Sequence, residues 1–324
     1  MCVLIVTHSQ DNESIPLVID AIESQGGRAF RFDTDRFPTQ VRLDIYYGRE
    51  EERLTLFSEA ATLDLREVSA VWYRRIAIGS RIPDTMEPQM RQASVQESRV
   101  TVRGLLASLQ AFYLDSIIKV ERAKNKQLQL KIAREIGLDI PRNLTTNNPE
   151  AVKEFVATCR EGAIAKMLSS FAIYDERGQE RVVFTNPVRS EDLENLDGLN
   201  FCPMTFQEQI PKTLELRSTI VGERVFTAAI DSQSNSHARH DWRRQGLVMI
   251  KDWKSYELPS EITEKLLELM RYFGLNYGAI DLILTPDNRY VFLEVNPVGE
   301  FFWLECYPPC FPISQAIAEL LVRG

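Results

Sequence analysis

The chain has 324 residues, enough for two or three domains, and 44% of them are hydrophobic against 26% charged, which excludes a disordered or fibrous protein. The formal net charge of −8 argues against a broad nucleic-acid-binding surface but is compatible with a basic peptide partner. No apolar run is long enough to span a bilayer, and the N-terminus lacks the basic region of a signal peptide. We therefore expect a cytoplasmic protein with neither a nucleic-acid nor a membrane partner.

Cysteine and histidine give no clear signal of a metal site or a disulfide framework. The five cysteines are odd in number and scattered along the sequence. Two of the three histidines, His237 and His240, lie close together, but their polar neighbours favour a solvated loop over a metal site. The sequence also contains neither a Gly-x-Ser-x-Gly elbow nor a Walker-type glycine–lysine loop.

The first part of the chain predicts a small α/β domain with a mainly parallel sheet. Hydrophobic patterns predict strands at 2–7, 28–32, 41–45, 54–56 and 69–74, and helices at 14–25 and 90–110. Arg74 and Arg75 stand at the end of the last strand, where α/β sheets usually open to a ligand crevice. Pairing of both arginines with nearby acids is an equally good interpretation.

A second unit begins near residue 117, where the composition changes. It contains a predicted amphipathic helix at 127–136, a helix that begins at Pro149, and strands at 162–167 and 181–185. Lys166 is the one cation on an apolar strand, so its ammonium needs a partner, either a phosphate or a protein carboxylate. The acidic run 191–195 has helical spacing and on its own is typical of a solvated helix face.

The remaining chain predicts a second sheet. Its strands are expected at 205–211, 214–221, 225–230, 276–284 and 290–297, with helices at 262–273 and 313–321. Glu215 and Arg217 are two residues apart on one strand and share a face, so both are placed to contact a third group. The polar stretch 232–246 is a long connection of the kind that often forms a lid or substrate loop.

Three hard-oxygen side chains fall in the last predicted hairpin. Asp281 lies on its first strand, and Glu294 and Asn296 lie two residues apart on its second strand, so that those two share a face. Buried carboxylates need partners. Mg²⁺ bound by one or two carboxylates together with substrate phosphates is one possibility, and acids satisfied by arginine or lysine are the other.

The order of these features along the chain resembles that of the ATP-grasp ligases, in the branch that contains the ribosomal-protein glutamate ligases. The features are Lys126 after Asn125, Lys166, Phe206–Ile210, Glu215–Arg217, Asp281 and Glu294–Asn296. The resemblance covers the whole chain and is strongest from 117 to 298. The segments 3–7, 30–35, 70–75 and 296–303 are similar to the microviridin-type peptide cyclases, the graspetide synthetases, and more to the ester-forming than to the amide-forming type.

This resemblance implies a fold and a division into domains. The fold class is α/β (α+β), an ATP-grasp fold with an N-terminal pre-ATP-grasp domain. The implied domains are a pre-ATP-grasp domain at 1–115, a central lid domain with a leader-binding region at 116–203, and a C-terminal ATP-grasp domain at 204–324. The family's homodimeric state is implied as well.

The resemblance also assigns the cofactors, ATP and Mg²⁺. Lys126 and Lys166 would contact the nucleotide phosphates, and Glu215 would hold the ribose. The adenine would be held by the four residues Gln207, Glu208, Gln209 and Ile210. Many ATP-grasp enzymes close over the phosphates with a glycine-rich loop, whereas 168–174 here contains no glycine, so the metal site is the better-founded expectation.

The same family pattern gives roles in catalysis. Asp281, Glu294 and Asn296 would bind two Mg²⁺ ions, and Arg217 would stabilise the phosphoryl group as it leaves ATP. Arg244, with Arg243 beside it, is the candidate for gripping substrate carboxylates.

The substrate implied by the family is a ribosomally made precursor peptide with a leader and a core. An Asp or Glu side chain would become an acyl phosphate, and a Thr or Ser hydroxyl would then close an ω-ester ring. The leader carries a helix with one arginine between aromatic residues, which changes the meaning of the acidic run: Glu191, Asp192 and Asn195 become the expected dock for that arginine. The alternatives are an amide-forming relative, a ligase that adds an amino acid to a protein or peptide, and a peptide-binding module without catalysis.

Overall fold

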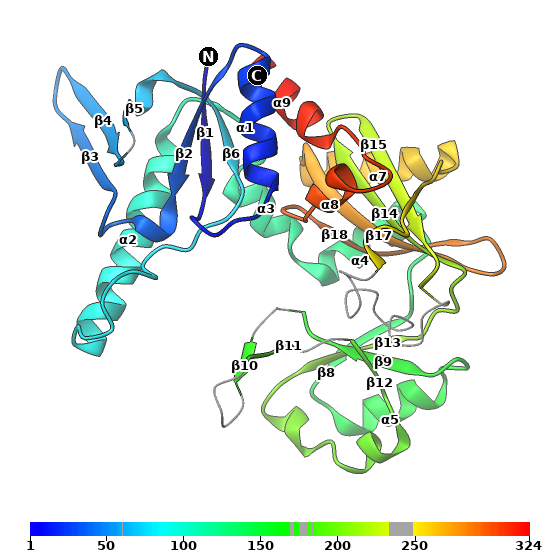
Figure 1. Cartoon of the computed structure of the whole chain (residues 1–324). Coiled ribbons are helices and arrows are strands. Elements are labelled where there is room, and N and C mark those ends of the chain that lie inside the picture. Colours follow the sequence, from blue (N-terminus) through cyan, green and yellow to red (C-terminus); the bar gives the residue numbers. More distant parts are fainter. Residues whose placement is uncertain (60, 169–171, 175–179, 183–184, 233–248) are drawn as a thin grey trace.

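The structure is a computed structural model and describes the whole chain except residues 60, 169–171, 175–179, 183–184 and 233–248. Figure 1 shows an N-terminal α/β part, a C-terminal sheet beside it, and a separate central part below them. No helix within the described ranges combines the length and the apolar character that crossing a bilayer requires.

The N-terminal part is built on a four-stranded parallel sheet with the order β2-β1-β6-β7. These strands are β1 (Cys2–Thr7), β2 (Arg28–Asp33), β6 (Val68–Tyr73) and β7 (Phe112–Tyr113). Every residue of β1 is buried, as expected for a strand covered on both faces. The helices are α1 (Ser14–Ser24) and α2 (Pro88–Ser108), with short 3₁₀ turns at Thr34–Arg36 and Leu65–Glu67.

A small antiparallel sheet extends from this domain. It consists of β3 (Arg42–Tyr47), β4 (Glu52–Phe57) and β5 (Thr62–Asp64). The predicted hairpin of 41–45 and 54–56 is thus confirmed, with a third strand added at its edge.

The central part is an antiparallel sheet with the order β12-β9-β13-β8. Its elements are β8 (Asn143–Thr146), α5 (Pro149–Ala157), β9 (Ala163–Lys166), β12 (Asn186–Pro187) and β13 (Met204–Glu208). Two 3₁₀ helices follow β12, at Ser190–Glu194 and Asp197–Asn200, and a separate hairpin pairs β10 (Ala172–Tyr174) with β11 (Glu180–Val182). The central part has its own small core, which contains Val152, Leu199 and Phe206.

The C-terminal sheet has the order β16-β15-β14-β17-β18. Its strands are β14 (Leu214–Val221), β15 (Arg224–Ile230), β16 (Lys254–Ser255), β17 (Tyr277–Leu284) and β18 (Tyr290–Asn296). The helices around it are α3 (Ile117–Ala123), α4 (Lys126–Ile136), α7 (Ser260–Phe273), α8 (Phe302–Cys306) and α9 (Ile313–Arg323). Helices α4 and α7 share one core with this sheet, whereas α9 packs with α1, so the C-terminal sheet and the N-terminal domain share a second core.

The predicted domain boundaries at 115/116 and 203/204 stay a prediction, and the elements that follow each of them make contacts across the chain. Helices α3 and α4 follow the first boundary but bury Ala123, Ile132 and Ala133 against the C-terminal sheet, because their apolar faces match it. Strand β13 follows the second boundary but pairs with β8 and β9 in the central sheet. Helices α3 and α4 thus pack with the C-terminal sheet, and β13 is a strand of the central sheet.

Candidate functional site

Three charged side chains form a row across the C-terminal sheet. Arg217 of β14 lies opposite Asp281 of β17, which in turn lies opposite Glu294 of β18. Directly opposed residues of an antiparallel pair project from the same face, so the three side chains stand side by side. Arg217 Nη1 donates to Asp281 Oδ1 at 2.8 Å. The sheet register therefore brings Arg217 and Asp281 together, which are 64 positions apart, and also Asp281 and Glu294, which are 13 positions apart. The sequence predicted only the second of these contacts, as part of the last hairpin.

Lys126 joins this row from helix α4. Its Nζ lies 2.7 Å from Glu294 Oε2 and donates to Asn296 Oδ1 at 3.2 Å. Asn296 Nδ2 donates to Glu294 Oε1 at 3.0 Å. The N-cap residue Asn125 accepts a hydrogen bond from the Leu128 N–H, which begins the helix at Lys126 and directs this lysine at the carboxylate.

Gln129 holds α4 against β18. Its side chain donates to the Val295 carbonyl at 2.8 Å and accepts from the Val295 N–H at 2.9 Å. Gln129 is fully buried, so both bonds replace water and fix the helix relative to the strand. The sequence analysis did not identify Gln129; a lone glutamine on an amphipathic helix carries no signal until its burial is known.

Glu294 is ionised in this setting. Burial opposes its ionisation, but the charge and hydrogen bond of Lys126, the Asn296 amide and the charge of Lys166 together lower its pKa to about 2. Lys166 at the end of β9 is thus within electrostatic reach of Glu294. Lys126 therefore contacts Glu294 directly, and Lys166 of the central sheet acts on Glu294 through its charge.

Arg217 is 8% exposed and stays charged. Burial alone would lower its pKa, but the charge and hydrogen bond of Asp281 outweigh burial and raise it. Its Nη2 donates to the Glu300 carbonyl at 3.2 Å. Its Nε is buried and has no hydrogen-bond partner among the described residues. A charged guanidinium with an unused donor suits a phosphate or carboxylate oxygen.

The oxygen ligands fit a magnesium ion that is bound together with phosphates. Asp281 and Glu294 supply carboxylates and Asn296 an amide oxygen, which are the hard donors that Mg²⁺ prefers. Within the described ranges, no group of three or more His, Cys, Asp or Glu residues could hold a metal. Two carboxylates and an amide therefore form an incomplete site, and Mg²⁺ commonly completes such a site with substrate phosphates and water. In this structure Arg217 and Lys126 neutralise both acids, the other interpretation that the sequence left open.

The residues expected to hold the nucleotide base and sugar lie between the central and C-terminal sheets. Gln207 is 3% exposed, and its Oε1 has no hydrogen-bond partner within the described part of the chain. The Glu208 carboxylate accepts from the Arg142 N–H at 2.8 Å, and the Gln209 N–H donates to the Gly162 carbonyl at 2.9 Å. These bonds fix the end of β13 next to Ile210.

Glu215, the residue expected to hold the ribose, begins β14 on the other side of this connection. Its Oε1 accepts from Lys212 Nζ at 2.7 Å, and both side chains are largely buried. Its predicted role stays a prediction.

The acidic segment that was expected to dock the leader is a 3₁₀ helix, Ser190–Glu194, and not an α-helix. Asp192 Oδ2 accepts from the Arg189 N–H at 2.8 Å, and Glu191 Oε1 accepts from Arg189 Nη1 at 3.1 Å. Such local side-chain bonds to the backbone compete with α-helix formation. Glu191, Asp192 and Asn195 are exposed together. Arg244 and its neighbour Arg243 lie outside the described residues.

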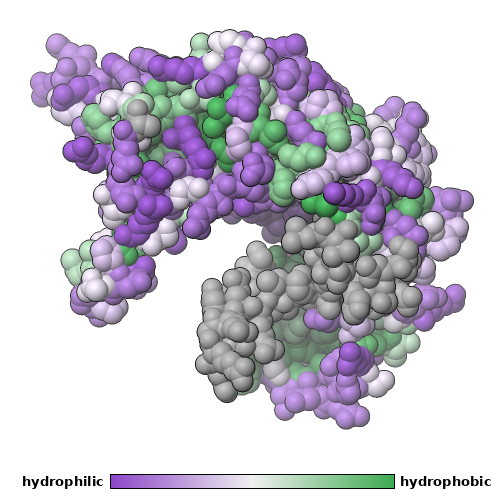
Figure 2. Space-filling model, in the orientation of Figure 1, coloured by the Kyte–Doolittle hydropathy of each residue, from purple (hydrophilic) through white to green (hydrophobic). Residues whose placement is uncertain are grey.

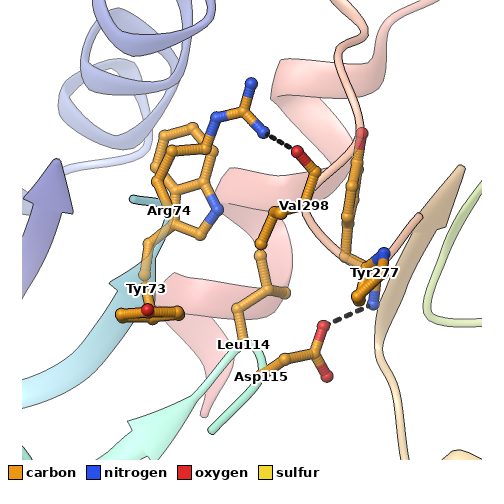
Figure 3. A pocket seen from close by; sticks show the side chains of 8 residues that line it. Tyr73, Arg74, Leu114, Asp115, Tyr277 and Val298 are labelled. Carbon is orange, nitrogen blue, oxygen red and sulfur yellow. Dashed lines mark hydrogen bonds between the residues drawn. The ribbon is translucent and has the colours of Figure 1, made fainter. Parts of the chain in front are cut away.

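Arg74 and Arg75 are paired with acids, as one of the two interpretations predicted. Arg74 Nη1 donates to the Val298 carbonyl at 2.6 Å (Figure 3). Arg74 Nη2 lies 2.6 Å from Glu300 Oε2. Arg75 lies 3.4 Å from Asp11 and also pairs with Glu300. Glu300 therefore ties the N-terminal domain to the segment after β18. The sequence analysis gave it no role, although it stands in the stretch 296–303 that carried part of the resemblance.

Comparisons with known proteins agree with this arrangement. The family model of the MvdD pre-ATP grasp domain matches residues 2–121. The crystal structure of macrocyclase MdnC bound with precursor peptide MdnA from Microcystis aeruginosa MRC is 59% identical, with a TM-score of 0.92 and 100% of both chains covered. A search of curated proteins gave no match.

Two further structures match almost the whole chain. The RiPP-associated ATP-grasp ligase of Chryseobacterium gregarium, in complex with ADP and a leader and core peptide, is 40% identical, with a TM-score of 0.95 over 99% of this chain and 96% of that one. Macrocyclase MdnB from Microcystis aeruginosa MRC is 39% identical, with a TM-score of 0.84 over 100% of this chain and 99% of its own. The predicted ATP-grasp fold is confirmed, and the chain belongs to the ATP-grasp ligase family of these peptide macrocyclases, the graspetide cyclases.

Proposed function

We propose that this protein is an ATP-dependent macrocyclase that joins side chains of a ribosomally made precursor peptide through ω-ester bonds. The observation that carries the proposal is the row of Arg217, Asp281 and Glu294 with Lys126 beside it. This row combines two cations with two carboxylates on one sheet face, as phosphoryl transfer from a magnesium nucleotide requires. The 59% identical relative is a macrocyclase that was crystallised with its precursor peptide.

The first step activates a carboxylate. An Asp or Glu carboxylate of the core attacks the γ-phosphorus of ATP, and the bond between this phosphorus and the oxygen that bridges to the β-phosphate breaks. ADP is the leaving group, and the peptide carries an acyl phosphate. Asp281, Glu294 and Asn296 would hold Mg²⁺, which neutralises the phosphate charge when it is bound. Lys126 and Lys166 orient the phosphates, and Arg217 stabilises the charge on the transferred group.

The second step closes the ring. A Thr or Ser hydroxyl of the same peptide attacks the acyl carbon, loses its proton, and releases inorganic phosphate, so that each ring costs the peptide one water. Water must be excluded meanwhile, because it would hydrolyse the acyl phosphate. We assign this role to the central domain, whose Lys166 lies within electrostatic reach of Glu294 from a separate sheet.

We base ester formation on the resemblance of the segments 3–7, 30–35, 70–75 and 296–303 to the ester-forming type. The lability of the product in mild base tests it. We would incubate the protein with a leader-plus-core precursor, ATP and Mg²⁺, and follow the peptide by mass spectrometry. Loss of one water per ring that mild base restores supports esters. Base-stable losses would move the protein to the amide-forming alternative, and a mass increase with a free amino acid present would make it an amino-acid ligase.

Leader recognition by Glu191, Asp192 and Asn195 belongs to the same proposal. Their exposure on one short 3₁₀ turn presents carboxylate and amide oxygens to solvent, which is a surface that a guanidinium can bind with paired hydrogen bonds. Arg189 occupies part of it in this structure, so a leader arginine would replace an exposed ion pair of little energetic weight.

We also propose a homodimer, in line with the family resemblance. Exposed apolar side chains on and beside α2 support it: Met86 is 37%, Met90 62% and Val100 53% exposed. Helix α2 projects from the N-terminal domain in Figure 1, so these side chains are open to a second copy. Sedimentation analysis tests this, since a purely monomeric protein at micromolar concentration would exclude it.

A further inference from the structure

A cavity of about 470 Å³ opens at the carboxyl end of the N-terminal parallel sheet. It lies among the loop after β6, helix α2 and the end of α3, and Val298 closes one side of it. Its volume is within the range of small-ligand sites. Figure 2 shows this face of the molecule hollowed between the N-terminal and central parts, with hydrophilic residues along the upper border of the hollow.

The lining of this cavity is strongly basic. Besides the paired Arg74 and Arg75, it contains Arg99, Arg103 and Lys124, against Glu121 as its one carboxylate. Lys124 and Glu121 pair with each other at 2.9 Å. Within the part of the chain that the structure describes, no carboxylate pairs with Arg99 or Arg103, so these two charges remain for an incoming group.

Arg99 and Arg103 are also four residues apart on α2. Like charges at this spacing repel each other across one helical turn and destabilise a helix by a few tenths of a kcal/mol. Burial, followed by the charge of Glu121, raises the pKa of the Tyr73 phenol that lines the same cavity, and Arg103 only partly opposes this rise. The Tyr73 phenol can therefore donate a hydrogen bond to an anion.

The cavity adjoins the phosphoryl-transfer site through the segment 298–300. Val298 lines the cavity, and its carbonyl accepts from Arg74. On the other side of the segment, the Glu300 carbonyl accepts from Arg217 Nη2, and Gly299 lies so close to Arg217 that an added Cβ would be 2.9 Å from Nη2. A peptide that presents one carboxylate to Arg217 would therefore have its neighbouring residues within reach of the cavity.

We propose that this cavity, with Arg99 and Arg103, is the subsite that binds acidic side chains of the core peptide while a neighbouring carboxylate is activated. The inference rests on the proposed function for the identity of the peptide, but the chemistry is that of an arginine pair receiving carboxylates. The two arginines are positioning residues that hold the core, and they need not touch the reacting atoms.

The test compares two peptides on three proteins. The probes are the MdnA precursor, labelled with a fluorophore, and a copy whose core Asp and Glu residues are replaced by Asn and Gln. The proteins are the wild type, the double variant Arg99→Gln/Arg103→Gln, and the control Lys131→Gln/Arg271→Gln, which removes two exposed cations from outside the cavity. Circular dichroism checks that all three are folded, and fluorescence anisotropy measures binding.

We expect the wild type and the control to bind the acidic peptide about tenfold more tightly than the neutral copy, the equivalent of one charge-assisted hydrogen bond. In the double variant this preference should shrink to the part that the carboxylate at Arg217 contributes. A preference for the acidic peptide that is as large in the double variant as in the wild type, or no preference in the wild type, would overturn the assignment. Cyclisation is measured separately, so a wild type that prefers the acidic peptide but forms no ring would refute the proposed reaction and leave the subsite standing.

Discussion

At the residue scale, opposite charges are concentrated on one face of the C-terminal sheet. Arg217 and Asp281 pair across β14 and β17, and Lys126 pairs with Glu294 on β18. Each acid has a cation within 3 Å, at 2.8 and 2.7 Å, so neither charge is isolated before a metal arrives. These pairs hold the carboxylate oxygens in position, and Lys126 keeps Glu294 ionised, which is the state in which it can accept Mg²⁺.

Asp281→Asn and Glu294→Gln each remove one negative oxygen from this face and keep the side-chain shape. We expect either substitution to lower the turnover number for precursor cyclisation by about 100- to 1,000-fold, as the loss of one electrostatic contact in a transition state does. Glu261→Gln is the matched control, since Glu261 is an exposed acid paired with Lys265 on α7. If the two variants turned over as fast as the Glu261→Gln control, Asp281 and Glu294 would have no role in catalysis.

Asp192→Lys tests the leader dock. The exposed carboxylate becomes a cation and repels the leader arginine, so we expect the affinity for the full precursor, measured by fluorescence anisotropy, to fall by about tenfold or more. ATP hydrolysis without peptide should persist, because Asp192 lies in a different domain from Asp281 and Glu294. Glu150→Lys, another exposed acid of the central domain, should leave precursor affinity unchanged. Equal loss of binding and hydrolysis would point to misfolding of the Asp192 variant.

The role of a single residue could be predicted where a local sequence pattern marks it, and not where the role arises from a contact with a residue distant in sequence. Asp281, Glu294 and Asn296 stand out in the sequence because polar side chains interrupt apolar strands, and the structure brings them to one place. Glu300 and Gln129 do not stand out, because their roles arise from contacts with residues 226 and 166 positions away in sequence. Long-range pairing of this kind leaves no local pattern.

At the element scale, the segment after β18 connects the site to the N-terminal domain. Within this segment Gly299 packs closely on the C-terminal sheet, since a Cβ there would lie 2.5 Å from Ala279 Cβ of β17 and 2.9 Å from Arg217 Nη2 of β14. A side chain at this position must displace the strand or the guanidinium.

We therefore expect Gly299→Ala to lower both the melting temperature and the cyclisation turnover, because Arg217 cannot keep its position. Gly104→Ala is the control: it lies within helix α2 with no atom within 4 Å of its added Cβ, and it should stabilise the protein by about 0.5–1 kcal/mol. Thermal denaturation and a turnover assay on both variants check this. Unchanged turnover in the Gly299 variant would show that the close approach to Arg217 has no functional role.

Asp115 caps the start of β17 at the junction of the two bodies (Figure 3). Its oxygens accept from the Asn276 N–H at 2.7 Å and the Tyr277 N–H at 2.9 Å. Burial nevertheless dominates over these bonds and over Lys119, and raises the pKa of Asp115 from 3.8 to about 7. The folded state thus binds a proton more tightly than the unfolded chain does, so this residue's contribution to stability falls as the pH rises from about 4 to about 7.

Asp115→Asn removes the titrating group. We expect the melting temperature of the variant to vary less between pH 5 and pH 8 than that of the wild type, with the wild type losing more stability toward high pH. The variant has one acceptor fewer at the strand start, so at pH 5 it should be the less stable of the two. Identical pH profiles for the two proteins would show that Asp115 does not titrate in this range.

The elements themselves were largely predictable. The apolar strands, the N-cap at Asn125 and the amphipathic helices follow local periodicity and capping, and the structure confirms them within a few residues. The 3₁₀ form of Ser190–Glu194 was missed because an acidic run with helical spacing does not reveal that Asp192 bonds to the Arg189 backbone.

At the scale of the whole molecule, the C-terminal sheet carries most of the site and has a neighbouring part on each side. The N-terminal domain and the C-terminal sheet share a core through α1 and α9, and the central domain carries Lys166 toward Glu294 from its own sheet. The packing of α3 and α4 on the C-terminal sheet could not be predicted from composition, because these helices follow the N-terminal strands directly in the sequence. The family resemblance supplied what local patterns could not, namely that these parts form an ATP-grasp enzyme.

The proposed reaction transfers the γ-phosphate of ATP to a carboxylate of the peptide. The most direct test uses a precursor whose core Asp and Glu carboxylates carry ¹⁸O, incubated with the enzyme, ATP and Mg²⁺. If an acyl phosphate forms and a hydroxyl displaces its phosphate, each ring closed should place one ¹⁸O atom in the released inorganic phosphate, as seen by mass spectrometry. Ring formation with unlabelled phosphate would contradict carboxylate phosphorylation and the roles assigned here to Arg217, Asp281 and Glu294.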